Sequence, residues 1–149
     1  MGMFTAFNIN ASGMTAQRYR MDIISENVAN ANTTRTQDGT PYRRKVVVFE
    51  EKGTGTGSFG SVFKTASNKF LGNGVKVATV KEDTWTQMNR VYDPSHPDAD
   101  ENGYVTYPNF NSITEMTNLI DASRAYEANS TAFAASKSMA LQGLNVGKS

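Results

Sequence analysis

The sequence has no cysteine and a single histidine, and these absences exclude several kinds of site. Without cysteine, the 149-residue chain can form neither a disulfide framework nor a thiolate metal site. Its one histidine, His96, would need carboxylates for every other zinc ligand, which is an uncommon set. The sequence also lacks the glycine-flanked serine of a nucleophile elbow. We therefore expect no metal, no cofactor and no enzymatic activity.

An excess of charge of one sign and long apolar runs are also missing. Fifteen basic residues balance fourteen acidic ones, which leaves a formal charge of +1 and no basic stripe for nucleic acid. No stretch approaches the roughly 18 apolar residues of a membrane span. The first basic residue, Arg18, comes too late for the charged start of a cleavable export signal. Taken alone, these features indicate a soluble cytosolic protein.

What the chain does have is helix periodicity at both ends. Residues 111–144 contain no proline, and their only glycine is Gly143, so a helix can run through most of this segment. Ser112 and Glu115 have the spacing of a capping box, which satisfies backbone N–H groups at a helix start. A helix of about 30 residues is about 45 Å long and needs a long partner. Its expected seam consists of Met116, Leu119, Ser123, Tyr126, Ser130, Phe133, Lys137, Ala140 and Leu144.

A second amphipathic element spans residues 4–31. Its apolar residues recur every seven positions, which is the period of the C-terminal seam. They are Phe7, Met14, Met21 and Val28, with Ala11, Ile24 and Ala31 beside them. We expect the two helices to pair as an α-helical coiled coil. Such a pair would leave outward side chains uncovered for neighbouring subunits, namely Ile113, Ile120, Ala134 and Leu141.

The middle of the chain has turn and strand chemistry instead. Turn residues at 30–39 end the first helix, and strand-like stretches follow at 42–50, 75–80, 84–92 and 104–107. We expect the basic cluster Arg43, Arg44 and Lys45 to line a solvated strand edge. The glycine-rich stretch 53–74 indicates a flexible insertion. The predicted fold is therefore α+β, with an N-terminal helix in 1–35, a small β-rich module in 36–110 and a C-terminal helix in 111–149.

Two strings in the middle match ligand-binding patterns incompletely. The glycines of 55–60 fit a dinucleotide pattern, but no amphipathic helix follows to present N–H groups to a phosphate. The loop 98–103 alternates carboxylates and an amide as a calcium loop does, but Asn109 stands at the twelfth position, where a glutamate is needed. A calcium- or nucleotide-binding module is therefore the alternative from a different class. Its best residues are Asp98, Asp100 and Asn102.

Strings near both ends carry a family resemblance. Residues 26–33 (Glu-Asn-Val-Ala-Asn-Ala-Asn-Thr) resemble the N-terminal signature of the bacterial flagellar basal-body rod protein family and its hook relatives. Residues 123–129 (Ser-Arg-Ala-Tyr-Glu-Ala-Asn) resemble the C-terminal signature. Within that group the chain most resembles the short proximal rod proteins, through strings at 38–43, 91–100, 103–105 and 108–109. The stretch 53–74 departs from their pattern.

The resemblance implies a structural subunit of the flagellar proximal rod, the drive shaft that transmits torque for motility. Such subunits are exported without a cleaved signal by the type III pathway and polymerise helically through paired terminal helices. The expected location is then the basal body within the cell envelope. The expected partners are other rod subunits, further copies of the chain, the export apparatus and neighbouring basal-body proteins. A distal rod or hook component is the closer alternative.

The same resemblance and the helix periodicity together suggest which residues pack the helices or contact other subunits. These are Phe7, Ala11, Met14, Met21, Ile24, Asn27, Val28, Asn30, Met116, Leu119, Ile120, Arg124, Tyr126, Asn129, Phe133, Leu141 and Leu144.

Overall fold

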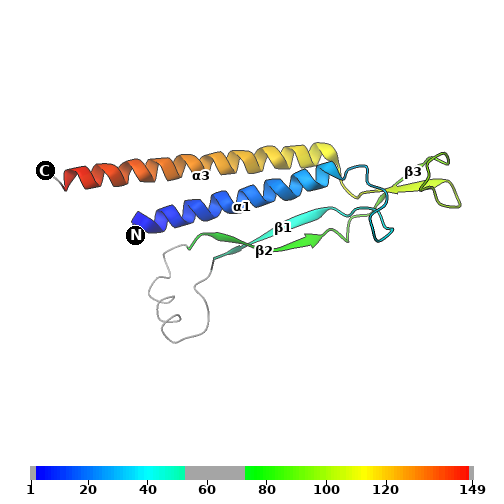
Figure 1. Ribbon diagram of the computed structural model, residues 1–149, viewed down its shortest axis with the longest axis horizontal. Helices are drawn as coiled ribbons and strands as arrows, with labels where there is room; N and C mark the ends of the chain where they lie inside the picture. The colour runs from blue at the N-terminus through cyan, green and yellow to red at the C-terminus, as the bar shows by residue number, and fades with distance from the viewer. Residues whose placement is uncertain (1–2, 53–72, 148–149) are drawn as a thin grey trace, which may run out of the picture. The chain divides into compact units, whose positions relative to one another are not determined.

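The computed structural model describes residues 3–52 and 73–147 and contains two long helices and four short strands in this part (Figure 1). In chain order these are α1 (Met3–Ala29), β1 (Lys45–Glu51), β2 (Val75–Glu82), β3 (Asn89–Tyr92), β4 (Tyr104–Tyr107) and α3 (Ser112–Val146). The α+β prediction is confirmed. Most of the predicted insertion 53–74, including the glycine loop 55–60, lies outside the described residues. Neither helix has, in its described part, an apolar stretch long enough to cross a membrane.

The start of α3 differs from the prediction. The N-cap is Asn111, whose Oδ1 accepts a hydrogen bond from the backbone N–H of Ile113 at 2.8 Å. The expected capping box of Ser112 and Glu115 is wrong, because the Glu115 carboxylate binds side chains of other segments instead. At its other end, α3 continues through Gly143 to Val146.

The third strand is shorter than expected. Asp83 lies after β2 and accepts hydrogen bonds from the backbone N–H and the hydroxyl of Thr86, at 3.0 and 2.7 Å. This turn uses backbone groups that a strand would need, so Trp85 lies in the connection, 71 % exposed, and β3 begins only at Asn89.

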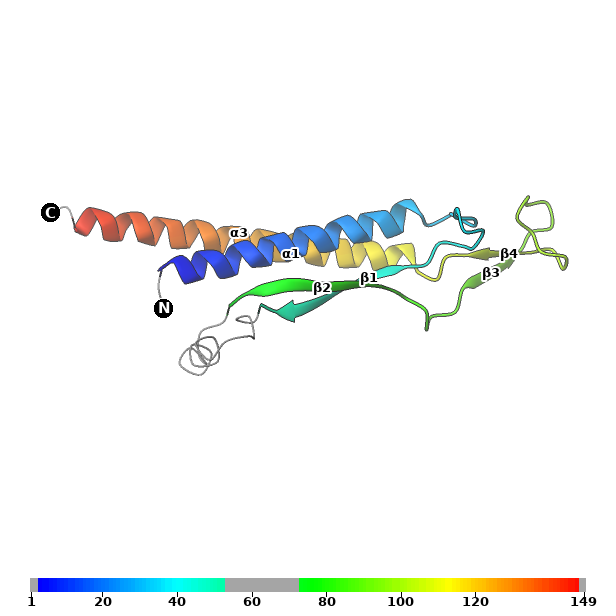
Figure 2. The same cartoon turned by 60° about the horizontal axis from the view of Figure 1, so that its bottom comes forward.

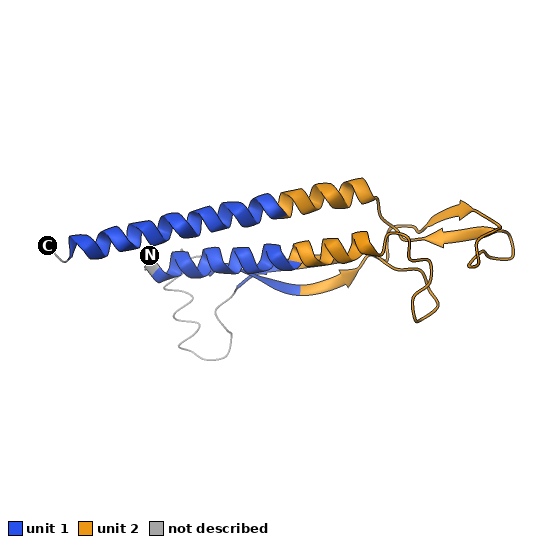
Figure 3. Cartoon of the chain, turned by 45° about the horizontal axis from the view of Figure 1, so that its top comes forward, with its two compact units in different colours: residues 1–19, 49–78, 123–149 blue, residues 20–48, 79–122 orange. Residues whose placement is uncertain are grey.

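The chain divides into two compact units, and each contains part of both helices (Figure 3). Unit 1 comprises residues 1–19, 49–78 and 123–149, and unit 2 comprises residues 20–48 and 79–122. These units follow contacts in space and not the order of segments along the chain. The division into segments 1–35, 36–110 and 111–149 stays a prediction.

Unit 1 contains the first part of α1, most of α3, the end of β1 and the start of β2. The rings of Phe7 and Phe133 join the two helices, with centroids 5.0 Å apart. Ala16 on α1 is the one residue of this unit's described part that belongs to the buried core, at 3 % exposure.

Unit 2 contains the end of α1, the beginning of α3 and the hairpin of β3 and β4. β3 and β4 pair antiparallel, with Tyr92 opposite Tyr104 and Asn89 opposite Tyr107 (Figure 2). The buried apolar residues of this unit are Ile24, Tyr42, Val105 and Ala122. They are accompanied by the buried polar residues Asn27, Asp83, Asn109 and Glu115.

Candidate assembly surfaces

Glu115 is the centre of a buried polar network in unit 2. It lies in the first turns of α3 and is 1 % exposed. Its Oε1 accepts hydrogen bonds from Arg44 Nη2 at 2.8 Å and Arg44 Nε at 2.9 Å. Its Oε2 accepts one from Asn27 Nδ2 at 3.2 Å. Because a buried carboxylate without partners is costly, these bonds hold the start of α3 against the end of α1 and the entry to β1.

Asn27 extends this network to β1. Its Oδ1 accepts hydrogen bonds from Tyr42 Oη and from the backbone N–H of Lys45, each at 2.9 Å. Its Nδ2 donates to the backbone carbonyl of Lys45 at 2.9 Å, so the side-chain amide pairs with β1 as a strand would. Burial, reinforced by the negative charges of nearby glutamates such as Glu26, raises the pKa of Tyr42 to about 12. The tyrosine hydroxyl therefore remains a donor at neutral pH.

A second branch of the network holds the turn after β2. Asn109 Oδ1 accepts a hydrogen bond from the backbone N–H of Arg44 at 3.0 Å, and Asn109 Nδ2 donates to the Asp83 carbonyl at 2.7 Å. Burial opposes ionisation of the Asp83 carboxyl, but hydrogen bonds from Thr86 and the charge of Arg44 lower its pKa. The network thereby connects five segments of unit 2, which are the end of α1, the entry to β1, the turn after β2, the segment before α3 and the start of α3.

The helices of unit 1 meet through contacts of another kind. The rings of Phe7 and Phe133 pack edge to face, as aromatic pairs prefer. The helices also approach closely at Gly13, where an added Cβ would lie only 2.6 Å from Asn129 Oδ1. The Asn129 side chain is held in this position because its Nδ2 donates to the Ala125 carbonyl at 2.7 Å. The absence of a side chain at Gly13 therefore permits the close approach of α1 and α3.

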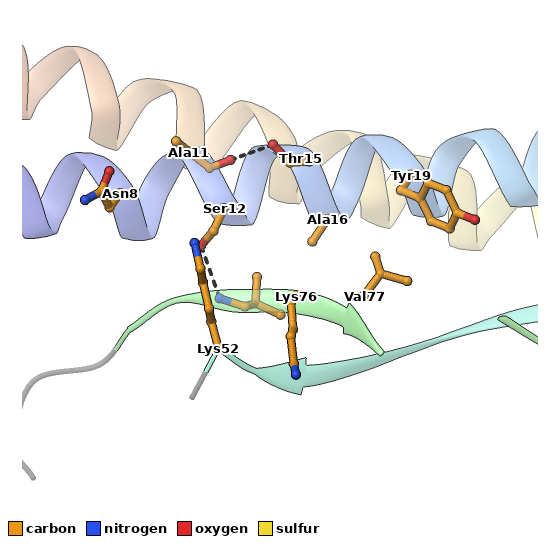
Figure 4. A pocket seen from close by; sticks show the side chains of 10 residues that line it. Asn8, Ala11, Ser12, Thr15, Ala16, Tyr19, Lys52, Lys76 and Val77 are labelled. Carbon is orange, nitrogen blue, oxygen red and sulfur yellow. Dashed lines mark hydrogen bonds between the residues drawn. The ribbon is translucent and has the colours of Figure 1, made fainter. Parts of the chain in front are cut away.

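Ser12 attaches β2 to α1 in unit 1. Its Oγ donates to the Ile9 carbonyl at 2.7 Å. The same oxygen accepts a hydrogen bond from the backbone N–H of Val75 at 3.1 Å, drawn as a dashed line in Figure 4. Gly74 has a φ of +89°, and a Cβ there would overlap the Ser12 hydroxyl. Only glycine meets both conditions, so the Ser12 contact depends on Gly74.

The carboxylates of the calcium-like loop 98–103 bind separate partners in unit 2. Asp98 accepts a hydrogen bond from Thr34 Oγ1 at 2.8 Å, whereas Asp100 pairs with Arg90 at 2.6 Å. Asn109, at the twelfth position, is buried in the Glu115 network. Within residues 3–52 and 73–147, no three His, Asp or Glu side chains gather to hold a metal ion. The geometry gives the calcium alternative no support, and the glycine loop of the nucleotide alternative lies outside the described residues.

Comparison with known proteins identifies the family. The family described as "Flagella basal body rod protein" matches residues 7–36, and "Flagellar basal body rod FlgEFG protein C-terminal" matches residues 101–146. Flagellar basal-body rod protein FlgC of Bacillus subtilis is 44% identical over 99% of this chain and 100% of its own. FlgC of Borreliella burgdorferi is 44% identical over 93% of each chain, and FlgC of Salmonella typhimurium is 38% identical over 99% of this chain and 100% of its own. The chain belongs to the FlgC family of flagellar basal-body rod proteins.

Membership of the FlgC family settles the broad function. The chain is a structural subunit of the proximal rod in the flagellar basal body, where it assembles with other rod proteins, and it is not an enzyme. The resemblance seen in the sequence is thus confirmed. The full-length relatives named above are FlgC proteins, which favours this assignment over the distal rod and hook alternatives.

The residues expected to pack helices or contact subunits fall into three groups in this rod protein. Ile24 and Asn27 are buried. Phe7, Ala11, Met14, Met21, Val28, Asn30, Leu119, Tyr126, Asn129 and Phe133 are half-buried. Met116, Ile120, Arg124, Leu141 and Leu144 are exposed. Contacts of these residues with other subunits stay a prediction.

The inward face of α3 includes positions that the expected seam omits. Ser130 and Lys137 of that seam are exposed, whereas the residues just before them, Asn129 and Ser136, are half-buried. Asn129 and Ser136 continue the spacing of seven from the buried Glu115 and Ala122. Small and polar side chains contribute to this face beside Leu119, Tyr126 and Phe133, so a search for large apolar residues finds only part of it.

The sequence did not reveal Tyr42, Arg44, Asp83 and Asn109 as parts of a buried network. The solvated edge expected for Arg44 is wrong, because its side chain is only 27 % exposed and binds Glu115, 71 residues further along the chain. No local pattern connects residues so far apart. The asparagine-rich string at 26–33 was the one available hint, since it contains Asn27.

Proposed function

We propose that this rod subunit polymerises through the outward faces of its two long helices, which pair as a coiled coil in the assembled rod and transmit torque along it. One observation carries the proposal. Of the core residues of the described chain, only Ala16 belongs to unit 1, and all others belong to unit 2. The helices of unit 1 therefore lack a closed core within one chain, and neighbouring subunits would complete it.

Exposed apolar side chains along α3 support this role. Ile113 is 75 % exposed and Ile120 is 54 % exposed in unit 2, and Leu141 and Leu144 are 52 % and 60 % exposed in unit 1. Met116 is also more than half exposed. Exposed apolar side chains that share one helix face, as the spacings of Ile113, Met116 and Ile120 allow, are typical of interaction sites.

The proposal gives each of the three predicted segments of the chain a role. Segments 1–35 and 111–149 form the assembly domain, and 36–110 forms the β-rich module between them in the sequence. Export by the flagellar type III apparatus fits such a subunit, because helices without a closed core are ordered mainly on assembly. Contact of the chain with the export apparatus belongs to the same proposal.

Aspartate substitutions at exposed positions test the proposal without disturbing the fold. Ile120→Asp and Leu141→Asp place a charge on the outward face of α3, which would be costly to bury against a neighbour. We expect each variant to be expressed and folded like the unmodified chain by circular dichroism, but to be absent from purified basal bodies and to leave cells non-motile.

Gln87→Asp provides the matched control, because it adds the same charge at an exposed position off both helices. It should incorporate normally. Normal motility of cells carrying Ile120→Asp or Leu141→Asp would contradict the proposal.

A further inference from the structure

Trp85 is the only tryptophan of the chain, and its side chain is 71 % exposed. It lies in the connection between β2 and β3, in unit 2. An indole ring offers a large apolar surface, and tryptophan is enriched among the residues that contribute most to binding at protein interfaces. Single exposed apolar residues are common on proteins, so exposure alone does not mark Trp85 as a contact.

The turn that carries Trp85 is held by hydrogen bonds on both sides of it. Asp83 is 2 % exposed, and its backbone N–H donates to the Arg44 carbonyl at 2.8 Å. The backbone N–H and the hydroxyl of Thr86 bind the Asp83 carboxylate. Asn109 Nδ2 donates to the carbonyls of both Asp83 and Thr86, at 2.7 and 3.3 Å. Because the turn is already ordered, a partner that covers the indole ring pays little conformational entropy.

Unit 1 contains a groove of a size that suits an indole ring. It is a cavity of about 530 Å³ between α1 and the strands β1 and β2, and we call it the α1–β2 groove (Figure 4). Cavities that hold small organic molecules measure roughly 300–1,000 Å³. The lining includes the small apolar side chains of Ala11, Ala16 and Val77 and the 41 % exposed ring of Tyr19. A captured indole would pack on the apolar side chains and pair with the tyrosine ring.

The groove also presents a lysine that has no acidic partner in the described part of the chain. Lys52 follows β1, and its side chain extends toward α1 (Figure 4). No ion pair within residues 3–52 and 73–147 involves it, and no acidic residue lines the groove. Lys76, in contrast, pairs with Glu50 at 3.2 Å and points away from α1. The negative face of an aromatic ring attracts a cation such as Lys52, and tryptophan is the best aromatic partner.

Both the ring and the groove are uncovered in the single chain. We propose that Trp85 of one copy docks into the α1–β2 groove of a second copy, with the indole against Tyr19 and its face toward Lys52. The contact joins two different surfaces of the same protein, and such heterologous contacts can repeat along a helical assembly without closing on themselves. The proposal rests on the assembly function proposed above and adds one contact to those made by the exposed faces of α3.

The single tryptophan makes this contact measurable by fluorescence. The unmodified chain is kept dilute, and a Trp85→Ala chain is added as the recipient, since it keeps the groove and removes only an exposed side chain. Excitation beyond the tyrosine absorption then reports Trp85 of the unmodified chain alone. The recipient is raised to about 1 mM, where a contact with a dissociation constant of about 1 mM is half formed. We expect the emission to move to shorter wavelength and acrylamide quenching to fall severalfold, because the ring leaves water.

A second change in the recipient identifies where the ring binds. Lys52→Glu should weaken the contact about tenfold, because it replaces the cation at the ring face with a negative charge. Lys81→Glu is the matched control, since it reverses the charge of an exposed lysine that does not line the groove. This control recipient should give the full emission shift.

Three results would overturn the docking proposal. The first is an unchanged emission at the highest recipient concentration. The second is an equal shift with the Lys52→Glu and Lys81→Glu recipients. The third is emission of a buried indole from the dilute unmodified chain without recipient, which would show that the ring is covered within its own copy.

The assembly function is judged separately, by the motility of Ile120→Asp and Leu141→Asp cells. If those cells lose motility while the emission stays unchanged, assembly through the helix faces stands and docking of Trp85 is contradicted. If the cells remain motile while the emission shift depends on Lys52, docking stands and assembly through the helix faces is contradicted.

Discussion

The two units of the chain are stabilised by opposite kinds of contact. Unit 2 is held by a buried network in which Glu115, Asn27 and Arg44 exchange directional hydrogen bonds. Unit 1 is held by an aromatic pair, by the close approach of Gly13 to Asn129 and by the Ser12 hydrogen bond to β2, and Leu141 and Leu144 stay exposed. The difference shows that nearly all of the buried core of the described chain lies in unit 2, although exposed apolar side chains of α3 occur in both units.

Physical chemistry explains why the two kinds of contact are useful in different places. A buried polar network is satisfied in only one arrangement of the segments that it joins, because any shift leaves a donor or a charge unpaired. Apolar contacts are non-directional and can be made with any complementary surface. A subunit that must join a polymer can therefore fix its own geometry with the polar network and offer exposed apolar helix faces for association.

Removing the centre of the polar network should have the largest effect. Glu115→Ala leaves Arg44 and Asn27 without their carboxylate partner, and we expect it to lower the free energy of unfolding by about 3 kcal/mol. Urea denaturation monitored by circular dichroism measures this. Glu127→Ala, which removes an exposed glutamate from the same helix, is the control and should change stability little. Similar losses in both variants would show that the network does not hold unit 2.

The corresponding change in unit 1 should cost less. Phe133→Ala removes a half-buried ring and its contact with Phe7, and we expect a loss of about 2 kcal/mol, below that of a fully buried ring. Phe4→Ala is the matched control, since Phe4 is 73 % exposed. The same denaturation experiment compares the two. A loss for Phe133→Ala larger than that for Glu115→Ala would reverse the comparison between the units.

Acid should affect unit 2 through Asp83. Its pKa is lowered in the folded chain from the ordinary value of 3.8, so the unfolded state binds the proton more readily. The carboxylate's contribution is therefore present above pH 3.8 and is lost as the pH falls through the lower, folded pKa.

Asp83→Asn removes this titration and should cost about 1.5 kcal/mol at neutral pH, the low end for a hydrogen-bonded charge. Unfolding measured from pH 6 downward should show a shallower acid decline in Asp83→Asn than in the unmodified chain. Parallel acid profiles would contradict the role given to Asp83.

Two glycines should respond oppositely to alanine. At Gly143 a Cβ meets no atom within 4 Å, so Gly143→Ala should stabilise α3 by up to about 1 kcal/mol. At Gly13 the added Cβ would crowd Asn129, so Gly13→Ala should not show this stabilisation. The Gly13→Ala/Asn129→Ala double variant, which lacks the crowding side chain, should show it. Thermal unfolding of the four proteins forms the test. Equal stabilisation by both single substitutions would show that the helices do not meet closely at Gly13.

Local structure was largely predictable from the sequence. The hydrophobic period and the asparagine-rich turn placed α1 within two residues of its observed bounds, Met3–Ala29. The alternating string Tyr104–Tyr107 was placed correctly as β4. These elements depend on propensity and period, which are properties of neighbouring residues.

The polar network was not predictable, because its partners are far apart in sequence. Asn27 and Glu115 are 88 residues apart, and the spacing of Glu115 from Ser112 suggested a local capping role instead. Likewise, the Asp83 turn shortened β3 although Trp85 favoured a strand. A tertiary contact prevailed over local preference at Glu115, and a competing local turn prevailed at Asp83.

The most direct test of the central claim is an electron-microscopy map of the intact basal body in which this chain is traced. We expect Ile120, Leu141 and Leu144, exposed in the single chain, to lie in van der Waals contact with neighbouring subunits. The Glu115 network should be unchanged. If those side chains face solvent in the assembled rod, the proposal that the subunit polymerises through the outward faces of its helices is contradicted.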